Sequence, residues 1–390
     1  MNDFDYLNEN DVYLDAACQS LRPRPVIDAL NNYYEKHNSC GERVKYAWGV
    51  ETDRKVEATR KKVLKFLKLR PRDYFVSFTL NTTYGLNLVL EQLDVEKLGI
   101  KKVITSDIEH NSPFLSTITF AKKNNLPREV VERAESGEMP LDYDYENAVV
   151  VVNNVCNFDG RRLENIKDLT KIIHNQGGIL IVDAAQGIAH DHDLLEKTDA
   201  DVICFSAHKM YSASLGGIIM KRSLIPAINT AFIGGGMVDD VDKDSFVLSA
   251  DNPDHAHTLF EPGLQAWGEI IALGAALDWL SGLKKSDKAS LAKNAEDLFN
   301  ILTEHEKLHV LNREPRPTMS FYVDKSELGY DSHLLGSALA DQGIMARTGY
   351  FCAHYFLDHK KHYPPLVRFS LGYHTRESDI EKVRAALAKI

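Results

Sequence analysis

Short apolar runs alternate with stretches of helical periodicity up to about residue 280. Six runs are rich in apolar and β-branched side chains: 74–78, 102–105, 148–152, 178–182, 202–205 and 217–220. Because these runs are apolar throughout instead of alternating, they predict strands that are covered on both faces. Helical spacing over 82–92 and 165–175 predicts helices that connect them. The alternation predicts an α/β fold with a mostly parallel sheet.

The pattern changes near residue 284, after a long apolar stretch of helical spacing over 261–280. Beyond it, helices and short strands follow one another as far as a final predicted helix over 376–390. A chain of 390 residues exceeds the usual size of one compact core. We therefore predict a large domain over 20–283 and a small α+β domain formed by 1–19 and 284–390.

Composition narrows the classes of function. The net charge of -10 argues against sequence-independent binding to nucleic acid or to an anionic membrane. No stretch approaches the roughly 20 apolar residues of a membrane span, and the N-terminus lacks a signal-peptide pattern. The five cysteines are scattered and form no C-x-x-C pair, so we expect a reducing, cytoplasmic location and no disulfide framework.

Two polar segments follow apolar runs at the edge of the sheet where open α/β proteins bind ligands. Asp183 ends one run, and Lys209 closes the segment Ser206-Ala207-His208-Lys209 after the next. Taken singly, such an aspartate is more often a helix cap or a loop residue, and such a lysine is usually solvated. Together they match pyridoxal phosphate (PLP), which needs an amine to form a Schiff base and a carboxylate to keep its ring nitrogen protonated.

Four further residues suit the phosphate group of such a cofactor. Thr82 and Thr83 open a predicted helix, whose free backbone amides and two hydroxyls form an anion site. Ser206 and His208 flank the lysine segment and can donate hydrogen bonds to the same phosphate. A plain capping threonine is the alternative reading of the helix start.

One imidazole and one amide side chain are suited to contact the cofactor ring. His110 follows the predicted strand 102–105 and could stack on an aromatic ring, although a surface-loop histidine would look the same in sequence. Gln186 lies three residues after Asp183 and can donate to a ring oxygen.

The order of these motifs resembles the class V, fold-type I aminotransferase superfamily, and most closely the group II cysteine desulfurases, including the selenocysteine lyases. The resemblance covers nearly the whole chain and rests on the segments 13–17, 81–85, 109–110, 155–157 with Gly160, 183–186, 206–209 and 347–353. It implies a large domain with a seven-stranded sheet and a homodimer with active sites at the subunit interface. It also implies a role for each PLP-site residue: Thr82, Thr83, Ser206 and His208 at the phosphate, His110 stacked on the ring, Asn157 beside ring and substrate, Asp183 on the ring nitrogen, Gln186 on the ring hydroxyl and Lys209 as the Schiff base.

Cys352 and Arg368 decide which reaction the resemblance implies. A free cysteine is by default a small buried hydrophobe, and a lone arginine a surface ion pair. Cys352 instead follows a glycine turn among aromatic residues and histidines, at the position of the desulfurase nucleophile. Arg368 lies where the family binds the substrate α-carboxylate, a role that suits a bidentate guanidinium.

The implied reaction converts L-cysteine to L-alanine and leaves the sulfur on Cys352 as a persulfide, which a sulfur-acceptor protein could then discharge. Three alternatives stay open on the same scaffold: a selenocysteine lyase, another C–S lyase or an aminotransferase, and a non-catalytic binding protein. Retention of Asp183, Lys209 and the phosphate loop argues against the last of these.

The chain departs from the family pattern at three positions. Leu264 replaces a threonine that reaches the phosphate in the neighbouring subunit, and Tyr350 and Phe351 replace two histidines before the cysteine. In relatives the segment after the glycine run 234–236 forms a hairpin directed towards the other subunit. No metal is predicted, because no acidic or cysteine ligands complete a metal-binding set with the paired histidines at 190/192 and 255/257.

Overall fold

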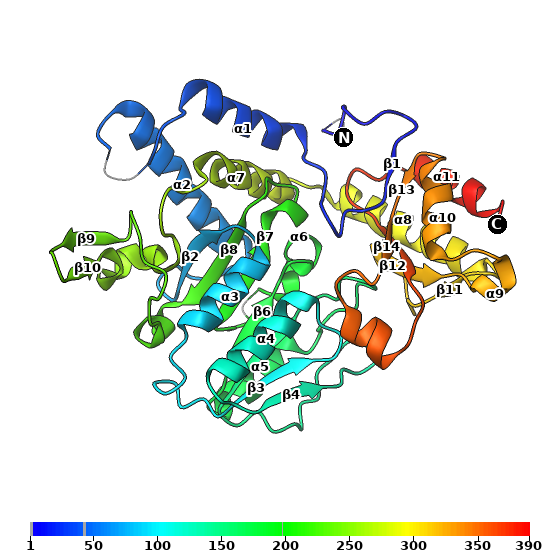
Figure 1. The fold of residues 1–390 in the computed structure, drawn as a ribbon. Coiled ribbons are helices and arrows are strands. Elements are labelled where there is room, and N and C mark those ends of the chain that lie inside the picture. Colours follow the sequence, from blue (N-terminus) through cyan, green and yellow to red (C-terminus); the bar gives the residue numbers. More distant parts are fainter. Residues whose placement is uncertain (1–2, 42–43, 197) are drawn as a thin grey trace. The chain divides into compact units, whose positions relative to one another are not determined.

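The computed structural model describes residues 3–41, 44–196 and 198–390, and these form two compact units (Figure 1). The larger unit comprises 25–154 and 163–281. The smaller unit comprises the described part of 1–24 together with 155–162 and 282–390. Asn157 therefore belongs to the smaller unit, whereas Lys209 and Asp183 belong to the larger one.

A seven-stranded sheet forms the centre of the larger unit, as the sequence predicts. Across the sheet the order is β2 (Tyr74–Thr79), β8 (Gly216–Lys221), β7 (Val202–Ser206), β6 (Ile179–Asp183), β5 (Ala148–Asn153), β3 (Lys102–Ser106) and β4 (Arg128–Val131). All neighbouring pairs are parallel except those of β8, which runs antiparallel to both β2 and β7. The carboxyl ends of β2, β3, β5, β6 and β7 consequently lie along one edge.

The helices of this unit are α1 (Arg24–Lys36), α2 (Ala47–Phe66), α3 (Thr82–Gln92), α4 (Asn111–Lys123), α5 (Ile166–Asn175), α6 (Gly187–His190) and α7 (Trp267–Ser281). The predicted helix over 261–280 is wrong at its start, because α7 begins only at Trp267. Pro262 lacks an amide hydrogen and Gly263 has φ +79°, so the chain turns there before the helix begins. An antiparallel hairpin, β9 (Val238–Val241) and β10 (Phe246–Leu248), precedes this turn.

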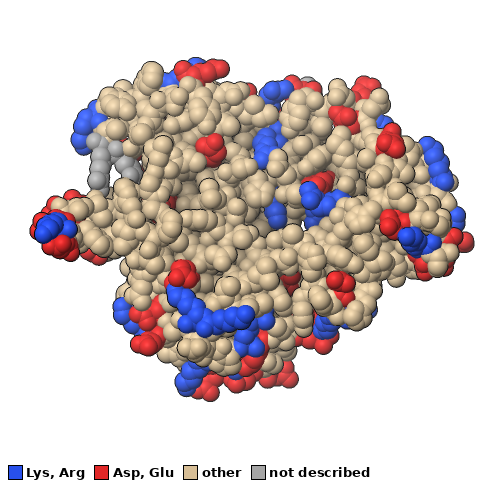
Figure 2. Space-filling model, in the orientation of Figure 1, with Lys and Arg blue, Asp and Glu red and all other residues tan. Residues whose placement is uncertain are grey.

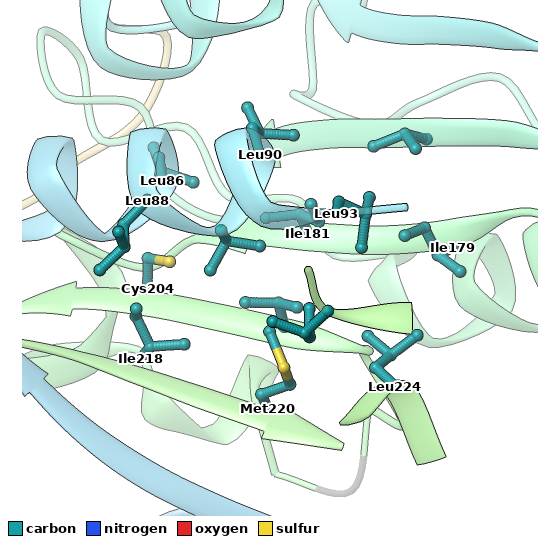
Figure 3. Packing of buried hydrophobic residues seen from close by; sticks show 14 of the residues in the cluster. Leu86, Leu88, Leu90, Leu93, Ile179, Ile181, Cys204, Ile218, Met220 and Leu224 are labelled. Atoms are coloured by element: carbon teal, nitrogen blue, oxygen red, sulfur yellow. The ribbon is translucent and has the colours of Figure 1, made fainter. Parts of the chain in front are cut away.

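One core cluster of the larger unit packs α3 and α4 against the sheet. Figure 3 shows Leu86 of α3 in the same buried cluster as Ile181 of β6 and Ile218 of β8. All three side chains are fully buried. Burial of this size stabilises a fold by about 1.5–3 kcal/mol per side chain. Because α3 is packed so tightly along its length, its first residues are fixed relative to the strand ends.

The smaller unit contains a four-stranded antiparallel sheet in the order β11 (His309–Val310), β12 (Thr318–Tyr322), β15 (Leu366–Ser370) and β14 (Arg347–Gly349). A second, two-stranded sheet pairs β1 (Val12–Tyr13) with β13 (Ile344–Met345) in parallel. Its helices are α8 (Lys285–Glu304), α9 (Lys325–Leu328), α10 (Ser332–Ala340), α11 (Glu377–Leu387) and a π-helix over Tyr355–Lys360. This unit is α+β, as predicted.

Charged side chains of both signs are interspersed on the face of the molecule that Figure 2 shows. None of the helices in the described residues combines the length and the apolar character needed to cross a membrane.

Candidate active site

The N-terminus of α3 and the end of β7 bring two predicted phosphate ligands, Thr82 and Ser206, into contact. The backbone amide of Thr82 donates to Ser206 Oγ at 2.9 Å, and the two hydroxyls lie 2.7 Å apart. Asn81 caps the helix, because its Oδ1 accepts from the amide of Tyr84 at 2.9 Å. The helix start therefore presents amides and hydroxyls at a positive dipole end, which suits a phosphate.

His110 is linked to this helix start through Ser112. Its Nδ1 accepts from the backbone amide of Ser112 at 3.0 Å, and the Ser112 hydroxyl lies 2.6 Å from that of Thr83. A ring nitrogen that accepts from an amide carries no proton, so the proton of a neutral ring lies on Nε2. The contacts fix the orientation of the predicted stacking residue.

Asp183 is a buried carboxylate at the end of the middle strand β6. It is 4% exposed, and its Oδ1 accepts from the amide of Ala185 at 2.9 Å. Burial raises the pKa of this carboxyl, whereas the positive charge of Lys209 acts in the opposite direction. Lys209 ends a short 3₁₀-helix, Ala207–Lys209, directly after β7. The lysine and the aspartate thus lie within electrostatic reach of one another.

Gln186 and His208 lie on the segments that follow the same two strands. Gln186 precedes α6, and His208 lies inside the 3₁₀-helix after β7; both are half-buried. The structure therefore places all the predicted cofactor residues of the larger unit at the carboxyl ends of β6 and β7 or on the segments after β2, β3, β6 and β7.

The chemistry of these groups fits PLP. The helix start and the Ser206 hydroxyl supply hydrogen-bond donors for the phosphate. Asp183 supplies a buried carboxylate, and a cation such as a protonated ring nitrogen stabilises the charged form of that carboxylate. Gly216 adds a steric requirement, because a Cβ atom there would lie 2.4 Å from Asn81 Cα. The backbone of the phosphate loop can approach β8 this closely only over a glycine.

In the smaller unit, Arg368 and Asn157 lie side by side with two buried polar atoms available. Arg368 is 2% exposed, and its Nη1 donates to the carbonyl oxygen of Asn157 at 2.9 Å. Within the described residues, Arg368 Nε and Asn157 Oδ1 have no hydrogen-bond partner. A buried donor and a buried acceptor left unpaired are costly unless a ligand completes them. An α-amino acid offers both a carboxylate and an amine.

Cys352 lies at the tip of a strained turn in the same unit. Phe351 and Cys352 have φ of +49° and +58°, in the left-handed region that costs side-chain-bearing residues about 1–3 kcal/mol. Phe351 is buried beneath the Arg368 guanidinium at 4.8 Å, and its carbonyl accepts from Asn157 Nδ2 at 2.6 Å. Ala353 is fully buried on the other side. The turn therefore holds an exposed thiol between two anchored neighbours.

Several residues of these two clusters were not predicted from sequence. Ser112 links Thr83 to His110, and Asp15 accepts from Arg368 Nη2 at 3.0 Å. Glu109 is fully buried and accepts from the amide of Asn153, which is the register partner of Asp183. Glu109 lies just after an apolar predicted strand, and this position was the only signal in the sequence for it. No local pattern indicates its partners.

Comparisons with known proteins extend over nearly the whole chain. A model of the aminotransferase class-V family matches residues 12–383. A probable cysteine desulfurase of Vibrio cholerae is 27% identical, covering 97% of this chain and 93% of that protein. One from Pseudomonas aeruginosa is 29% identical, with coverage of 96% and 92%. The apo cysteine desulfurase of Thermococcus onnurineus NA1 superposes with a TM-score of 0.86 at 26% identity, covering 97% and 94% of the two chains. The architecture is the fold-type I fold that the sequence predicts.

Proposed function

Because the chain belongs to the aminotransferase class-V family, we propose that it is a PLP-dependent cysteine desulfurase. It converts L-cysteine to L-alanine and carries the released sulfur as a persulfide on Cys352. The observation that carries this proposal is the exposed Cys352 thiol on an anchored turn whose neighbour Phe351 lies against the buried Arg368 guanidinium. An aminotransferase needs no thiol at this place.

Each protein group has a task in the proposed reaction. Arg368 binds the substrate carboxylate through Nε and Nη2, and Asn157 Oδ1 accepts from the substrate amine. Bound PLP supplies an electron sink for the carbon from which a proton is removed. Lys209 holds the cofactor and then moves the proton from the substrate Cα, whereas Asp183 stays charged and pairs with the ring nitrogen.

The sulfur transfer step uses Cys352 as the nucleophile. Its thiolate attacks the substrate sulfur, so that an S–S bond forms while the substrate C–S bond breaks. The electron pair of that bond stays with the carbon skeleton, which takes up a proton and leaves as L-alanine. Cys352 then carries one additional sulfur atom, and a thiol acceptor can remove it.

We propose a homodimer as the active assembly. Large apolar side chains are exposed on one stretch of the larger unit: Phe232, Ile233, Val241, Phe246, Val247 and Leu264. Exposed apolar side chains gathered on one segment are typical of a protein interface. Leu264 is 76% exposed, and its side chain has no hydrogen-bond donor for a phosphate in the neighbouring subunit.

We also propose a cytoplasmic location and a sulfur-acceptor protein as partner. All five cysteines are unpaired, which suits a reducing compartment. Because Cys352 is exposed at the tip of an anchored turn, a persulfide there is accessible to the thiol of a docking partner.

The test compares wild type, Cys352→Ala and the matched control Cys40→Ala, which removes another exposed thiol. With L-cysteine, wild type and the control should form alanine and sulfide, and mass spectrometry after differential alkylation should place the persulfide on Cys352. The Cys352→Ala protein should fold, bind PLP and still bind L-cysteine, but lose sulfur release by a factor of about 100 or more.

Other outcomes favour the alternatives. Equal sulfide production by Cys352→Ala would contradict the proposal and indicate a C–S lyase that needs no protein thiol. Turnover of selenocysteine with none of cysteine would indicate a selenocysteine lyase. Transfer of the substrate amino group to the cofactor would indicate an aminotransferase.

A further inference from the structure

Two arginines face each other across neighbouring strands of the small sheet. Arg347 of β14 is the register partner of Arg368 of β15 in an antiparallel pair. Like charges placed directly opposite one another destabilise a sheet. Burial also lowers the pKa of Arg368, because desolvation disfavours the charged guanidinium. This pair requires a negative charge nearby.

Asp15 supplies that charge and is shared by both guanidiniums. Its Oδ1 accepts from Arg368 Nη2 at 3.0 Å, and its Oδ2 accepts from Arg347 Nε at 3.1 Å. Arg347 also donates through Nη2 to Cys18 Sγ at 2.9 Å. The second guanidinium is therefore turned towards the N-terminal segment, and the cluster of two arginines and one aspartate retains a single net positive charge.

The backbone around Asp15 keeps the carboxylate in place. Asp15 forms a parallel bridge with Ser370 at the end of β15. The amide of Ala16 donates to the Ser370 carbonyl at 3.2 Å, and the amide of Ala17 donates to Ser370 Oγ at 2.9 Å. Asp15 is thus attached to the same strand that carries Arg368, and its side chain is only 16% exposed.

We propose that Asp15 determines the charge specificity of the substrate site: it restricts the Arg368–Arg347 pair to amino acids that carry one carboxylate. The inference rests on the proposed role of Arg368 as the carboxylate ligand. With Asp15 in place, Arg347 is occupied, and a second anionic group of a ligand meets the negative charge of Asp15. Without that charge, Arg347 is released and the two guanidiniums match a ligand with two negative charges.

The experiment measures binding of L-alanine and L-aspartate to the PLP-loaded protein by calorimetry, with the cofactor absorbance as a second readout. In wild type, L-alanine should bind more tightly than L-aspartate. In Asp15→Asn, the ratio of the two dissociation constants should shift towards L-aspartate by about tenfold to a hundredfold. Asp15→Glu keeps the charge and should keep the wild-type preference.

A purely structural role for Asp15 would weaken both ligands together and leave their ratio unchanged, and that result would overturn the proposal. Should Asp15→Asn fail to fold, Arg347→Gln provides a second test. Asp15 then pairs with Arg368 alone, so L-alanine should bind about tenfold more weakly, and L-aspartate should lose more. Equal affinities in Arg347→Gln and wild type would also overturn the proposal.

The design separates this inference from the proposed function. Neither ligand contains sulfur, so the preference can be measured whether or not the enzyme releases sulfur from cysteine. If Arg368→Ala binds L-alanine as tightly as wild type, then the carboxylate role of Arg368 is wrong, and the premise fails instead of the inference.

Discussion

Glu109 is a buried carboxyl group next to the predicted stacking residue His110. Its carboxylate oxygens contact the Ser106 hydroxyl and accept from the amide of Asn153 at 2.8 Å, and Arg133 Nη1 lies 3.7 Å away. Burial is the dominant cause that raises its pKa, to about 8, and Arg133, Ser106 and Asn153 oppose the rise. Because its pKa is raised to about 8, Glu109 keeps its proton to a higher pH in the native protein than in an unfolded chain.

This raised pKa predicts a loss of stability as the pH rises. An unfolded glutamate titrates near pH ~4.3, so between about pH 4.3 and 8 the unfolded chain releases a proton that the native protein retains. The stabilisation is complete at low pH and is lost as the pH rises through the folded pKa. Glu109→Gln is neutral in both states and should lack this dependence. Urea unfolding of both proteins between pH 5 and 8 tests it, and parallel pH profiles would contradict it.

At the scale of single residues, the sequence predicted those side chains that carry local patterns. Lys209, Asp183 and Thr82 each follow an apolar run, and the edge of the sheet brings them together. Asp15 and Arg368 are 353 positions apart, and Glu109 and Asn153 are 44 apart. Pairs of this kind depend on strand order and register, which residue periodicity does not encode.

The element that positions the cofactor residues is the junction between β8 and the start of α3. A Cβ atom on Gly216 would lie 2.4–2.6 Å from the backbone of Asn81, which caps α3. Backbone atoms cannot move aside as a flexible side chain can. We expect Gly216→Ala to displace the first turn of α3 and to lower PLP affinity by at least about tenfold, the equivalent of ~1.4 kcal/mol.

Gly235→Ala is the matched control, because a Cβ atom there would have no neighbour within 4 Å. Equilibrium dialysis of PLP against both variants and wild type measures the effect. Equal cofactor affinity in all three proteins would show that the start of α3 accommodates the additional Cβ atom without loss of PLP binding. That result would contradict a rigid junction between β8 and α3.

Strand direction and the start of α7 are features of the elements that the sequence pattern did not predict. The runs over 202–205 and 217–220 were correctly predicted as strands, but β8 runs antiparallel to both of its neighbours. An apolar run has the same pattern in either direction, so hydrophobic periodicity predicts a buried strand without its orientation. The start of α7 was misplaced because the apolar spacing continues across Pro262 and Gly263, where backbone conformation ends it.

For the whole molecule, the proposed dimer can be tested through the β9–β10 hairpin. Val241 and Phe246 are register partners at its tip and are 64% and 50% exposed. Sedimentation equilibrium should give wild type twice the chain mass of 43.9 kDa. Substituting both residues by aspartate should shift the equilibrium towards the monomer, because charge would have to be buried at the interface.

Leu334→Asp serves as control, since Leu334 is 59% exposed on α10 of the smaller unit. A wild-type protein that sediments as a monomer at micromolar concentration would contradict the dimer. Dissociation by Leu334→Asp instead would move the interface to the smaller unit.

The bridge between Asp15 and β15 has a consequence for how the protein is made. The segment that carries Asp15 is synthesised before its partner Arg368, which is added 353 residues later. The sheet of the larger unit ends with β8 at Lys221, so the cofactor residues are complete long before the arginine cluster is. A nascent or prematurely ended chain can therefore present Lys209 and Asp183 but has no paired arginines with which to select an amino acid. The arginine cluster proposed to select the substrate can therefore form only after β15 has been synthesised.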